Sequence, residues 1–427
     1  MLRQRECRYR NIGFISTRIA GTDGVSLEIE KWAAVLERND FTCFYFSGEN
    51  DRPPEKCMLV EEAHFFHPEI QEINDLVYGR RVRPQELTRK IHQLRDYLKQ
   101  KIYEFVKHFE IDLIIPENAL AIPLNIPLGL ALVEYIAETG IPTLAHHHDF
   151  SWERTRFLVN AVEDFLAYAF PPNLPTMQHA VINSLASEQL SHRRGISNSI
   201  IPNVYDFATP PPPFKNCSEE LRREVGLGRE DLFILQPTRV VPRKWIERSL
   251  EIVRLMELER PVLIISHSAE DEGDLYNQRI QEYAARLGVE LISIEHLVKE
   301  NANSGGNNSK FSIGDVYQCA DLVSYPSGYE GFGNAFIETI YYRKPIIVNR
   351  YSIYVADIEP LGFDVIPIEG FVTGETIKKV FEVLNDGKRL QEMTDRNYQL
   401  GNRYFSYEVL ERALLHLIDV LETQCGG

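Results

Sequence analysis

Residues 327–339 have the sequence Ser-Gly-Tyr-Glu-Gly-Phe-Gly-Asn-Ala-Phe-Ile-Glu-Thr, and the expected architecture is built around them. An apolar run at 320–326 ends at a proline and predicts a buried strand, while the residues that follow have the apolar periodicity of a helix. Glycine lets a backbone approach a ligand closely, and the free N–H groups of a helix's first turn favour an anion or a hydroxyl oxygen. This order of strand, glycine-rich turn and helix therefore predicts a cradle for a phosphate or a sugar.

Two carboxylates in this stretch, Glu330 and Glu338, have seven residues between them. One lies on the predicted turn and the other about a turn and a half into the predicted helix, so the two can line one cleft at two depths. Charged residues usually just solvate a helix face, but that alternative does not explain the glycines. We therefore favour a ligand site over a solvated acidic face.

The spacing of Glu330 and Glu338, with Gly331-Phe332-Gly333 between them, resembles the signature of the retaining glycosyltransferases of family 4. The resemblance implies an α/β fold of the GT-B type, with two Rossmann-like parallel-sheet domains facing across a cleft. It also implies that Glu330 contacts the donor sugar, that Glu338 contacts the ribose of the nucleotide, and that the turn and helix start bind the donor. These last donor-binding residues are Gly331, Phe332, Gly333 and Asn334.

Length and composition set outer limits on the function. A chain of 427 residues suits two domains of about 200 residues better than one core. The net charge of −16 argues against a nucleic-acid partner, because a phosphate backbone requires a basic surface. No apolar run is long enough to cross a bilayer, and no hydrophobic stretch follows the first residues. We therefore expect no transmembrane segment, no signal peptide and a cytoplasmic protein; a homodimer is compatible with the sequence.

The expected domains are an acceptor-side domain at 1–208, a donor domain at 209–397 and a returning segment at 398–427. Residues 199–207 resemble the family's strand that carries the chain from the first domain to the second. Four prolines at 210–213 are stiff and cannot join a central strand, so we place the hinge at about 203–216. A final helix from about 407 to 423 is expected to cross back to the first domain, as in GT-B enzymes.

The first domain opens with a strand at 11–17, a loop, a helix at 27–38 and a strand at 41–46. Ligands of such Rossmann-type units bind outside the carboxyl ends of the strands. The loop glycines do not have the G-x-G-x-x-G spacing of a dinucleotide site. The corresponding family 4 loop reaches toward the donor phosphates, which implies a donor contact from Gly24. Asp23 can face donor or acceptor, and we group it with the acceptor.

Three adjacent histidines follow a predicted strand at 142–145. Successive strand side chains point to opposite faces, so the three cannot all bind one metal ion, and we expect no metal site here. In family 4 a His-Asp pair after this strand lies beside the reacting carbon of the donor, which implies a catalytic role for His148 in the pair with Asp149. A solvated or structurally hydrogen-bonded imidazole remains the alternative for His146 and His147.

The acceptor is expected at a group of polar residues that follow the strands of the first domain: Glu117, Asn118, Asp149 and Arg154. Arg154 and Arg156 could bind an acidic acceptor such as a glycerate or a sugar phosphate. The set resembles enzymes that build compatible solutes, including mannosylglucosylglycerate synthases. A lipid or polysaccharide acceptor is the alternative.

The second domain opens with a strand at 232–236 and a loop that carries Arg239 and Lys244. A guanidinium grips phosphate oxygens in pairs and an ammonium supplies a point charge, which suits a diphosphate leaving group. The spacing resembles the family's Arg-x4-Lys pair, which binds the diphosphate, so we assign both residues to catalysis and donor binding. We interpret Arg243 and Arg248 as solvated.

The acidic cluster at 270–274 could hold a divalent cation, but it lacks the D-x-D spacing, and a helix N-terminus explains its charge equally well. We therefore expect no required cofactor, no essential Mg²⁺ and no metal ligands. The Asn/Gly-rich stretch 301–309 is interpreted as an insertion.

Together these features predict a retaining transferase that moves glucose or mannose from a UDP- or GDP-sugar to a hydroxyl of a small acceptor, such as a glycerate glycoside. No carboxylate is placed convincingly as a nucleophile, so we favour attack from the same face as the leaving phosphate. The alternatives are an epimerase or phosphorylase of the same fold and a non-catalytic regulator that binds a nucleotide sugar.

Overall fold

The computed structural model describes residues 9–21, 23–212, 216–228, 230–267, 274–298 and 310–425. The chain divides into two compact units: unit 1 comprises Met1–Pro202 and Glu408–Gly427, and unit 2 comprises Asn203–Tyr407. Apart from the backbone of its last residue, the acidic cluster 270–274 lies outside the described residues, as does the stretch 301–309.

The unit boundaries differ from the expected 208/209 and 397/398 because residues 203–207 pair with the end of unit 2. Tyr205 forms a parallel bridge with Ser406, and its N–H donates to the carbonyl of Phe405 at 2.8 Å. The Tyr398 hydroxyl donates to the carbonyl of Phe207 at 3.0 Å. Hydrogen bonds between segments almost 200 residues apart in sequence are not visible as a composition change, so the expected first boundary lies six residues too late and the expected second boundary ten residues too early.

In the described residues, unit 1 contains a seven-stranded sheet with the strand order β3-β2-β1-β4-β5-β6-β7. All neighbouring strands are parallel, with Ile12 opposite both Cys43 and Leu113 in the registers of β1. The strands are β1 (Asn11–Ile15), β2 (Thr42–Ser47), β3 (Cys57–Leu59), β4 (Leu113–Pro116), β5 (Thr143–His147), β6 (Met177–Val181) and β7 (Ser199–Ile200).

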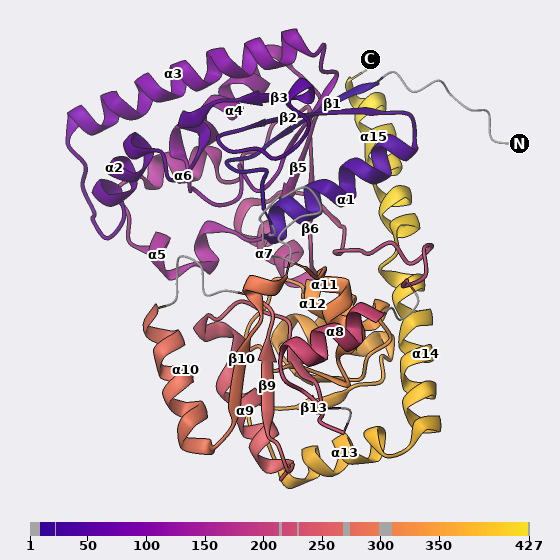
Figure 1. The fold of residues 1–427 in the computed structure, drawn as a ribbon. Helices are drawn as coiled ribbons and strands as arrows, with labels where there is room; N and C mark the ends of the chain where they lie inside the picture. Colours follow the sequence, from indigo (N-terminus) through magenta and orange to yellow (C-terminus); the bar gives the residue numbers. More distant parts are fainter. Residues whose placement is uncertain are drawn as a thin grey trace, which may run out of the picture. The chain divides into compact units, whose positions relative to one another are not determined.

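Helices lie on either side of this sheet (Figure 1). They are α1 (Gly24–Arg38), α2 (Pro68–Val77), α3 (Gln85–His108), α4 (Ile126–Thr139), α5 (Thr155–Leu158), α6 (Glu163–Ala169) and α7 (Ser184–Arg194). The stripe Leu87, Ile91, Leu94, Leu98 and Ile102 of α3 is buried in the main core, as its periodicity predicts. From Glu408 onward, helix α15 (Tyr407–Cys425) belongs to unit 1. Near the end of this helix, the Gln424 side chain accepts a hydrogen bond from the Gln178 side chain of β6 at 2.8 Å.

Unit 2 contains, in its described residues, a six-stranded parallel sheet with the order β10-β9-β8-β11-β12-β13. The strands are β8 (Ile234–Gln236), β9 (Val262–Ile265), β10 (Glu290–Ser293), β11 (Leu322–Tyr325), β12 (Ile346–Asn349) and β13 (Ile366–Ile368). The helices are α8 (Asn216–Glu224), α9 (Ile246–Leu255), α10 (Asp274–Leu287), α11 (Ile313–Cys319), α12 (Asn334–Tyr341), α13 (Gly374–Leu384) and α14 (Gly387–Tyr404). The expected fold class of two Rossmann-like parallel-sheet domains is thus confirmed.

The strand, turn and helix expected at 320–339 are present as β11, a turn and α12. All of β11 is buried, and Gly333 precedes α12 with a φ of 127°, a conformation that a side chain rarely tolerates. In a parallel sheet all strands end at the same edge, so the residues after β8, β9 and β11 come together in unit 2, and those after β4 and β5 come together in unit 1.

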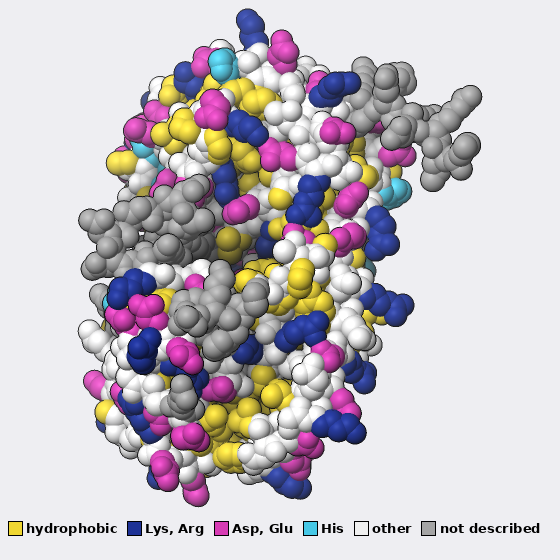
Figure 2. All heavy atoms as spheres, turned by 45° about the vertical axis from the view of Figure 1, so that its right-hand side comes forward, with side chains coloured by type: hydrophobic (Ala, Val, Ile, Leu, Met, Phe, Trp, Pro, Cys, Tyr) yellow, Lys and Arg dark blue, Asp and Glu magenta, His cyan; other side chains and the backbone are white. Residues whose placement is uncertain are grey.

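Acidic and basic side chains are mixed over the face of the molecule that Figure 2 shows. Among the described helices, none has the length and apolar character that a membrane span requires.

Candidate active site

Glu330 is the centre of a buried charge cluster in unit 2. Its Oε1 contacts the ammonium of Lys244, and its Oε2 accepts a hydrogen bond from Arg243 Nη1 at 2.8 Å. The side chains of Glu330 and Lys244 are only 8% and 10% exposed. One carboxylate therefore holds two cations at the edge where β8 and β11 end.

The loop after β8 holds these cations in place through contacts made by its backbone. Gln236, the last residue of β8, donates from Nε2 to the carbonyl of Lys244 at 3.2 Å. Gly328 donates from its N–H to the carbonyl of Arg243 at 2.9 Å. The ring of Trp245 occupies the space that a Cβ at Gly328 would fill, so glycine is required there for the close approach of the two loops.

The electrostatics of the cluster favour an ion pair. Burial alone would raise the pKa of Glu330, but the charges of Lys244 and Arg243 outweigh it and lower that pKa to about 2. Burial lowers the pKa of Lys244, and the Glu330 carboxylate opposes this change. Because the carboxylate is ionised throughout the neutral range, we assign the pair its charged form.

Arg239 and His267 extend the cluster. Burial, and after it the charges of Lys244 and Arg239, lower the pKa of His267 to about 4, so this imidazole is neutral at pH 7. His267 follows β9, and its Nδ1 lies 2.8 Å from the hydroxyl of Ser266. The residues after β8 and β9 thus combine fixed positive charge with a neutral ring.

The turn before α12 is held by aromatic residues. The hydroxyl of Tyr351 donates to the carbonyl of Phe332 at 2.7 Å, and the Phe332 ring packs edge-on against Phe405. At the start of the helix, Asn334 accepts a hydrogen bond from Asn203 at 2.7 Å. Farther along, Glu338 is half-buried and accepts a hydrogen bond from the Tyr317 hydroxyl at 2.8 Å. Glu330 and Glu338 therefore have different partners.

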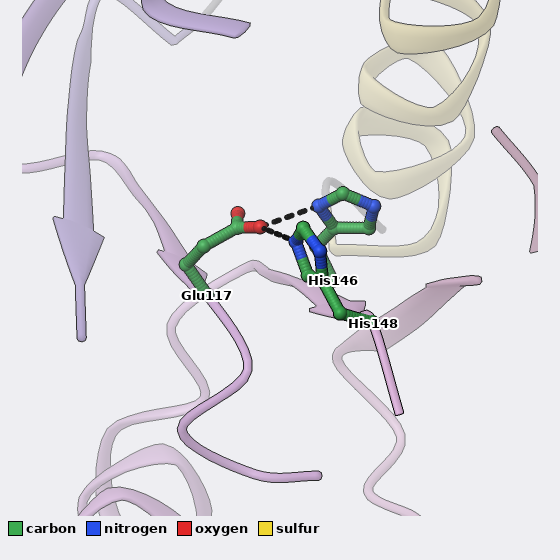
Figure 3. Close-up of side chains that lie close together, drawn as sticks. All are labelled: Glu117, His146 and His148. Carbon is green, nitrogen blue, oxygen red and sulfur yellow. Dashed lines mark hydrogen bonds and ion pairs between the residues drawn. The ribbon is translucent and has the colours of Figure 1, made fainter. Parts of the chain in front are cut away.

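In unit 1, Glu117 lies directly after β4 and points toward two imidazole rings (Figure 3). Its Oε1 lies 2.6 Å from Nδ1 of His146 and 2.6 Å from Nε2 of His148. The Glu117 side chain is fully buried, and its Oε2 has no hydrogen-bond partner among the residues that the structure describes. A single carboxylate oxygen thus serves both rings.

The three adjacent histidines alternate across the sheet as the strand geometry predicts. His146 and His148 share the face of Glu117, while Nε2 of His147 lies 3.0 Å from Nδ1 of His179 on β6. The His146 ring stacks on Trp32 of α1 with centroids 4.1 Å apart. His146 and His147 are therefore buried and hydrogen-bonded, so of the two alternatives the structurally hydrogen-bonded imidazole is confirmed and the solvated one is wrong.

Burial and hydrogen bonding compete at the Glu117 cluster. Burial opposes the charged form of His148, but the hydrogen bond to Glu117 outweighs it and raises the pKa of this histidine above its ordinary value. At His146 burial prevails and lowers the pKa. Burial would also raise the pKa of Glu117, yet the charge of His146 and the hydrogen bonds from both rings leave it below its ordinary value.

The remaining acceptor candidates of unit 1 form a chain beside His148. The Asn118 side chain accepts a hydrogen bond from the His148 N–H at 3.1 Å and donates one to Asp149 at 3.0 Å. Asp149 in turn pairs with Arg154, whose side chain is 43% exposed. Glu117, Asn118, His148, Asp149 and Arg154 are thus linked by successive hydrogen bonds and ion pairs.

Comparisons with known proteins give the family of the chain. Residues 218–399 match the model of the glycosyl transferases group 1. The mannosylglucosylglycerate synthase of Thermotoga maritima is 30% identical over 94% of this chain and 98% of its own. The chain belongs to the group 1 glycosyl transferases.

Solved structures agree on the fold. A glycosyltransferase from Rickettsia africae superposes with a TM-score of 0.70 at 13% identity, covering 97% of this chain and 99% of its own. Anabaena Alr3699/HepE, solved in complex with UDP-glucose, superposes with a TM-score of 0.62 at 14% identity and covers 97% of this chain and 99% of its own. The GT-B architecture expected from residues 327–339 is confirmed.

Within each unit, the structure brings together most of the site residues that the sequence predicts. In unit 2 these are Lys244, Glu330, Arg239 and the turn of Gly331, Phe332, Gly333 and Asn334. The interpretation of Arg243 as solvated is wrong, because its guanidinium binds Glu330. Arg248 instead pairs with Glu251 one helical turn away, as a surface residue would.

Two expected residues, Asp23 and Gly24, stand at the start of α1. The Asp23 carboxylate caps α1 by accepting from the N–H groups of Val25 and Ser26, and it pairs with Arg18 at 3.2 Å. Gly24 is the first residue of α1. Asp23 therefore has a structural role as an N-cap, whatever else it contacts.

Sequence reasoning missed His267 and the contact of Glu117 with two histidines. His267 stands alone after a strand in the sequence, and only the order β9-β8-β11 places it beside the cations. Glu117 and His148 are 31 residues apart, and they meet because β4 and β5 are neighbours. A signal existed in both cases: a polar residue directly after a buried parallel strand.

Proposed function

We propose that this glycosyltransferase moves a hexose, glucose or mannose, from a UDP- or GDP-sugar to a hydroxyl of a small acidic acceptor such as a glycerate glycoside, with retention of configuration. The observation that carries the proposal is the contact of Glu330 with both Lys244 and Arg243 beside the turn that leads into α12. The UDP-glucose complex of the Anabaena protein supports a nucleotide-sugar donor. The name of the Thermotoga relative supports mannose as the hexose and a glycerate glycoside as the acceptor.

In this proposal unit 2 binds the donor. The ammonium of Lys244 and the guanidinium of Arg239 bind the diphosphate, and the first N–H groups of α12 add their partial charge. Glu330 binds the hexose that reacts, while Glu338 binds the ribose hydroxyls. Because Glu330 also holds Lys244, the sugar and its leaving group are tied to one hydrogen-bonded cluster.

The chemical step needs charge stabilisation more than a strong base. The bond between the anomeric carbon and the phosphate oxygen breaks, and the acceptor oxygen bonds to the same face of that carbon. The proton of the acceptor hydroxyl passes to the departing phosphate oxygen. Lys244 and Arg239 stabilise the negative charge that develops on the diphosphate, so we propose that no divalent cation is required.

In unit 1 we assign His148 to the substrate and Asn118, Asp149 and Arg154 to the acceptor. Arg154 is the exposed end of the hydrogen-bonded chain, and a carboxylate on the acceptor would compete with Asp149 for its guanidinium. This exchange of one carboxylate for another gives an acidic acceptor an advantage over a neutral one.

A matched set of acceptors tests the proposal. UDP-glucose and GDP-mannose are each incubated with the full chain and glucosylglycerate, or with glucosylglycerol, which lacks the carboxylate. We expect transfer from one donor to glucosylglycerate, a slower reaction with glucosylglycerol, and an unchanged anomeric configuration in the product by NMR. Tight donor binding without transfer or donor hydrolysis would instead support the non-catalytic regulator, and transfer to lipid or polysaccharide alone would refute the small acceptor.

A further inference from the structure

The hydrogen bonds of Glu117 determine where the protons of two imidazoles lie. An ionised carboxylate only accepts hydrogen bonds, so each nitrogen that contacts Oε1 must carry a proton. His146 is thus protonated on Nδ1 and His148 on Nε2. In the neutral rings this leaves the lone pair of His146 on Nε2 and the lone pair of His148 on Nδ1.

The two rings differ in exposure, and that of His148 is the more exposed. Nε2 of His146 is buried and has no partner in the described part of the chain, and the His146 ring stacks on Trp32. His148 lies at the end of the strand with 10% of its side chain exposed, against 1% for His146. The backbone of His148 is held as well, because its N–H donates to Asn118.

The same three residues have the composition of a metal site, so that arrangement must be weighed. Ligands of a tetrahedral zinc ion, with bonds of about 2.0–2.1 Å, lie roughly 3.3 Å from one another. The two N–O distances at Glu117 are 2.6 Å, which is the length of a charge-assisted hydrogen bond. The second nitrogen of a zinc-bound histidine also usually has a partner, whereas the described residues offer none to Nε2 of His146. The geometry favours protons over a metal ion.

We propose that Glu117 is a positioning residue for His148: by accepting the Nε2 proton it fixes the ring so that Nδ1 accepts a hydrogen bond from a sugar hydroxyl. This inference rests on the proposed function only in assigning His148 to the substrate. His146 completes the support, since it uses the same oxygen of Glu117 and packs beside His148 with ring centroids 4.6 Å apart.

The charged groups around His148 set the direction of its pH response. They are Glu117 after β4, His146 on β5, Glu28 on α1, and Asp149 beside it in the chain. The carboxylates favour the imidazolium, in which Nδ1 also carries a proton and no longer accepts. Activity should therefore fall as pH decreases through the pKa of His148, and Glu117→Gln should move this acidic limb to lower pH.

The experiment combines NMR and kinetics on the full chain. With ¹⁵N-labelled histidine we expect wild-type His148 in the Nε2–H tautomer and a mixture of tautomers in Glu117→Gln. That variant should lower kcat about 10–100-fold. His148→Asn and the double variant Glu117→Gln/His148→Asn should have the same kcat, since Glu117 acts through His148. His179→Asn, which alters the buried imidazole pair on the opposite face of the sheet, is the control and should retain the wild-type tautomer of His148.

Several results would overturn the positioning role. They are a wild-type His148 protonated on Nδ1 alone, His148 signals unaffected by Glu117→Gln in an active chain, multiplying rate losses in the double variant, or one equivalent of zinc bound by wild type and lost in Glu117→Gln. The first needs no variant, so the proposal stays testable if Glu117→Gln does not fold. A wild-type chain that transfers no sugar but shows the expected tautomers would refute the proposed function alone.

Discussion

In each unit a buried carboxylate binds two nitrogen-bearing side chains. The two clusters differ in whether those side chains gain or lose protons near neutral pH. In unit 2 Glu330 uses both oxygens, one for Lys244 and one for Arg243. In unit 1 Glu117 uses a single oxygen for His146 and His148. An ammonium and a guanidinium keep their charge across the neutral range, whereas imidazoles gain or lose theirs within it.

This difference separates two tasks that a sugar transfer requires. The unit 2 cluster supplies constant positive charge, which suits a diphosphate that is negative at every physiological pH. The unit 1 cluster controls the direction and protonation of one ring, which suits a hydroxyl group. The predictions below test whether the unit 2 cluster stabilises the charge of the diphosphate and whether the unit 1 cluster controls the protonation of His148.

The largest effect is expected from Lys244→Ala. Removing a charge that is already in position for the departing phosphate should lower kcat about 10²–10³-fold. Arg248→Ala removes a neighbouring cation that pairs with Glu251 and lies over the Phe371 ring, outside the Glu330 cluster, so it is the matched control and should retain wild-type kcat. Initial rates with saturating donor measure both variants. Near-wild-type turnover in Lys244→Ala would mean that Lys244 does not supply the leaving-group charge.

The next prediction compares the two carboxylates of unit 2. Glu330→Gln removes the partner of two cations and a contact to the reacting sugar, so it should chiefly lower kcat and leave the affinity for free nucleoside diphosphate nearly unchanged. Glu338→Gln removes binding shared by ground and transition states, so it should chiefly raise the donor KM and weaken inhibition by the nucleoside diphosphate. Exchanged effects, or none, would show that Glu330 and Glu338 do not divide the hexose and the ribose between them.

Much of the fold could be predicted from the sequence because parallel strands are buried on both faces and appear as short apolar runs. The runs at 112–116, 261–266 and 345–349 predict strands, and they correspond to β4, β9 and β12 within one residue at each end. β3 and β13 could not be recognised, since each has three residues and β13 contains Pro367 in its middle. Such edge strands are defined by their neighbours and not by their own pattern.

The site residues also differ in how well the sequence predicts them. Lys244 and Glu330 could be singled out because each lies in a short motif with a distinct spacing. Arg243 could not be told from a solvated cation, since its contact with Glu330 spans 87 residues. Asp23 precedes a helix, and its position before Gly24 and Val25 already indicates an N-cap, so weighing that local role first would have improved the prediction.

A smaller effect is expected in the stability of the chain in mild acid. Burial lowers the pKa of His179 to about 4 and places that of His147 well below its ordinary value of 6.5. The unfolded chain binds protons on both rings near pH 6.5, whereas the folded chain does not. Their contribution to the free energy of unfolding is therefore complete above pH 6.5 and declines as pH falls toward 4, by at most about 1.4 kcal/mol per pH unit for each ring.

Urea unfolding of wild type and His179→Asn at several pH values measures this contribution. The variant should be less stable than wild type at pH 8, and the difference should shrink as the pH approaches 4.5, because the variant has one fewer ring to protonate on unfolding. If the free energies of unfolding of the two proteins depended on pH in the same way, burial of the His179 ring would not contribute to the acid sensitivity of unit 1.

The smallest expected effect is that of chelation, and it tests both halves of the comparison at once. If cations of the protein serve the diphosphate in unit 2 and protons bridge Glu117 in unit 1, EDTA should leave kcat within about twofold. The two clusters fail this test in different ways. Loss of activity that Mg²⁺ restores would give a role to the acidic residues at 270–274, because hard oxygen ligands favour that ion. Loss that only Zn²⁺ restores would point to Glu117, His146 and His148, because imidazoles favour the softer ion, and the 2.6 Å contacts would then have to lengthen to admit it.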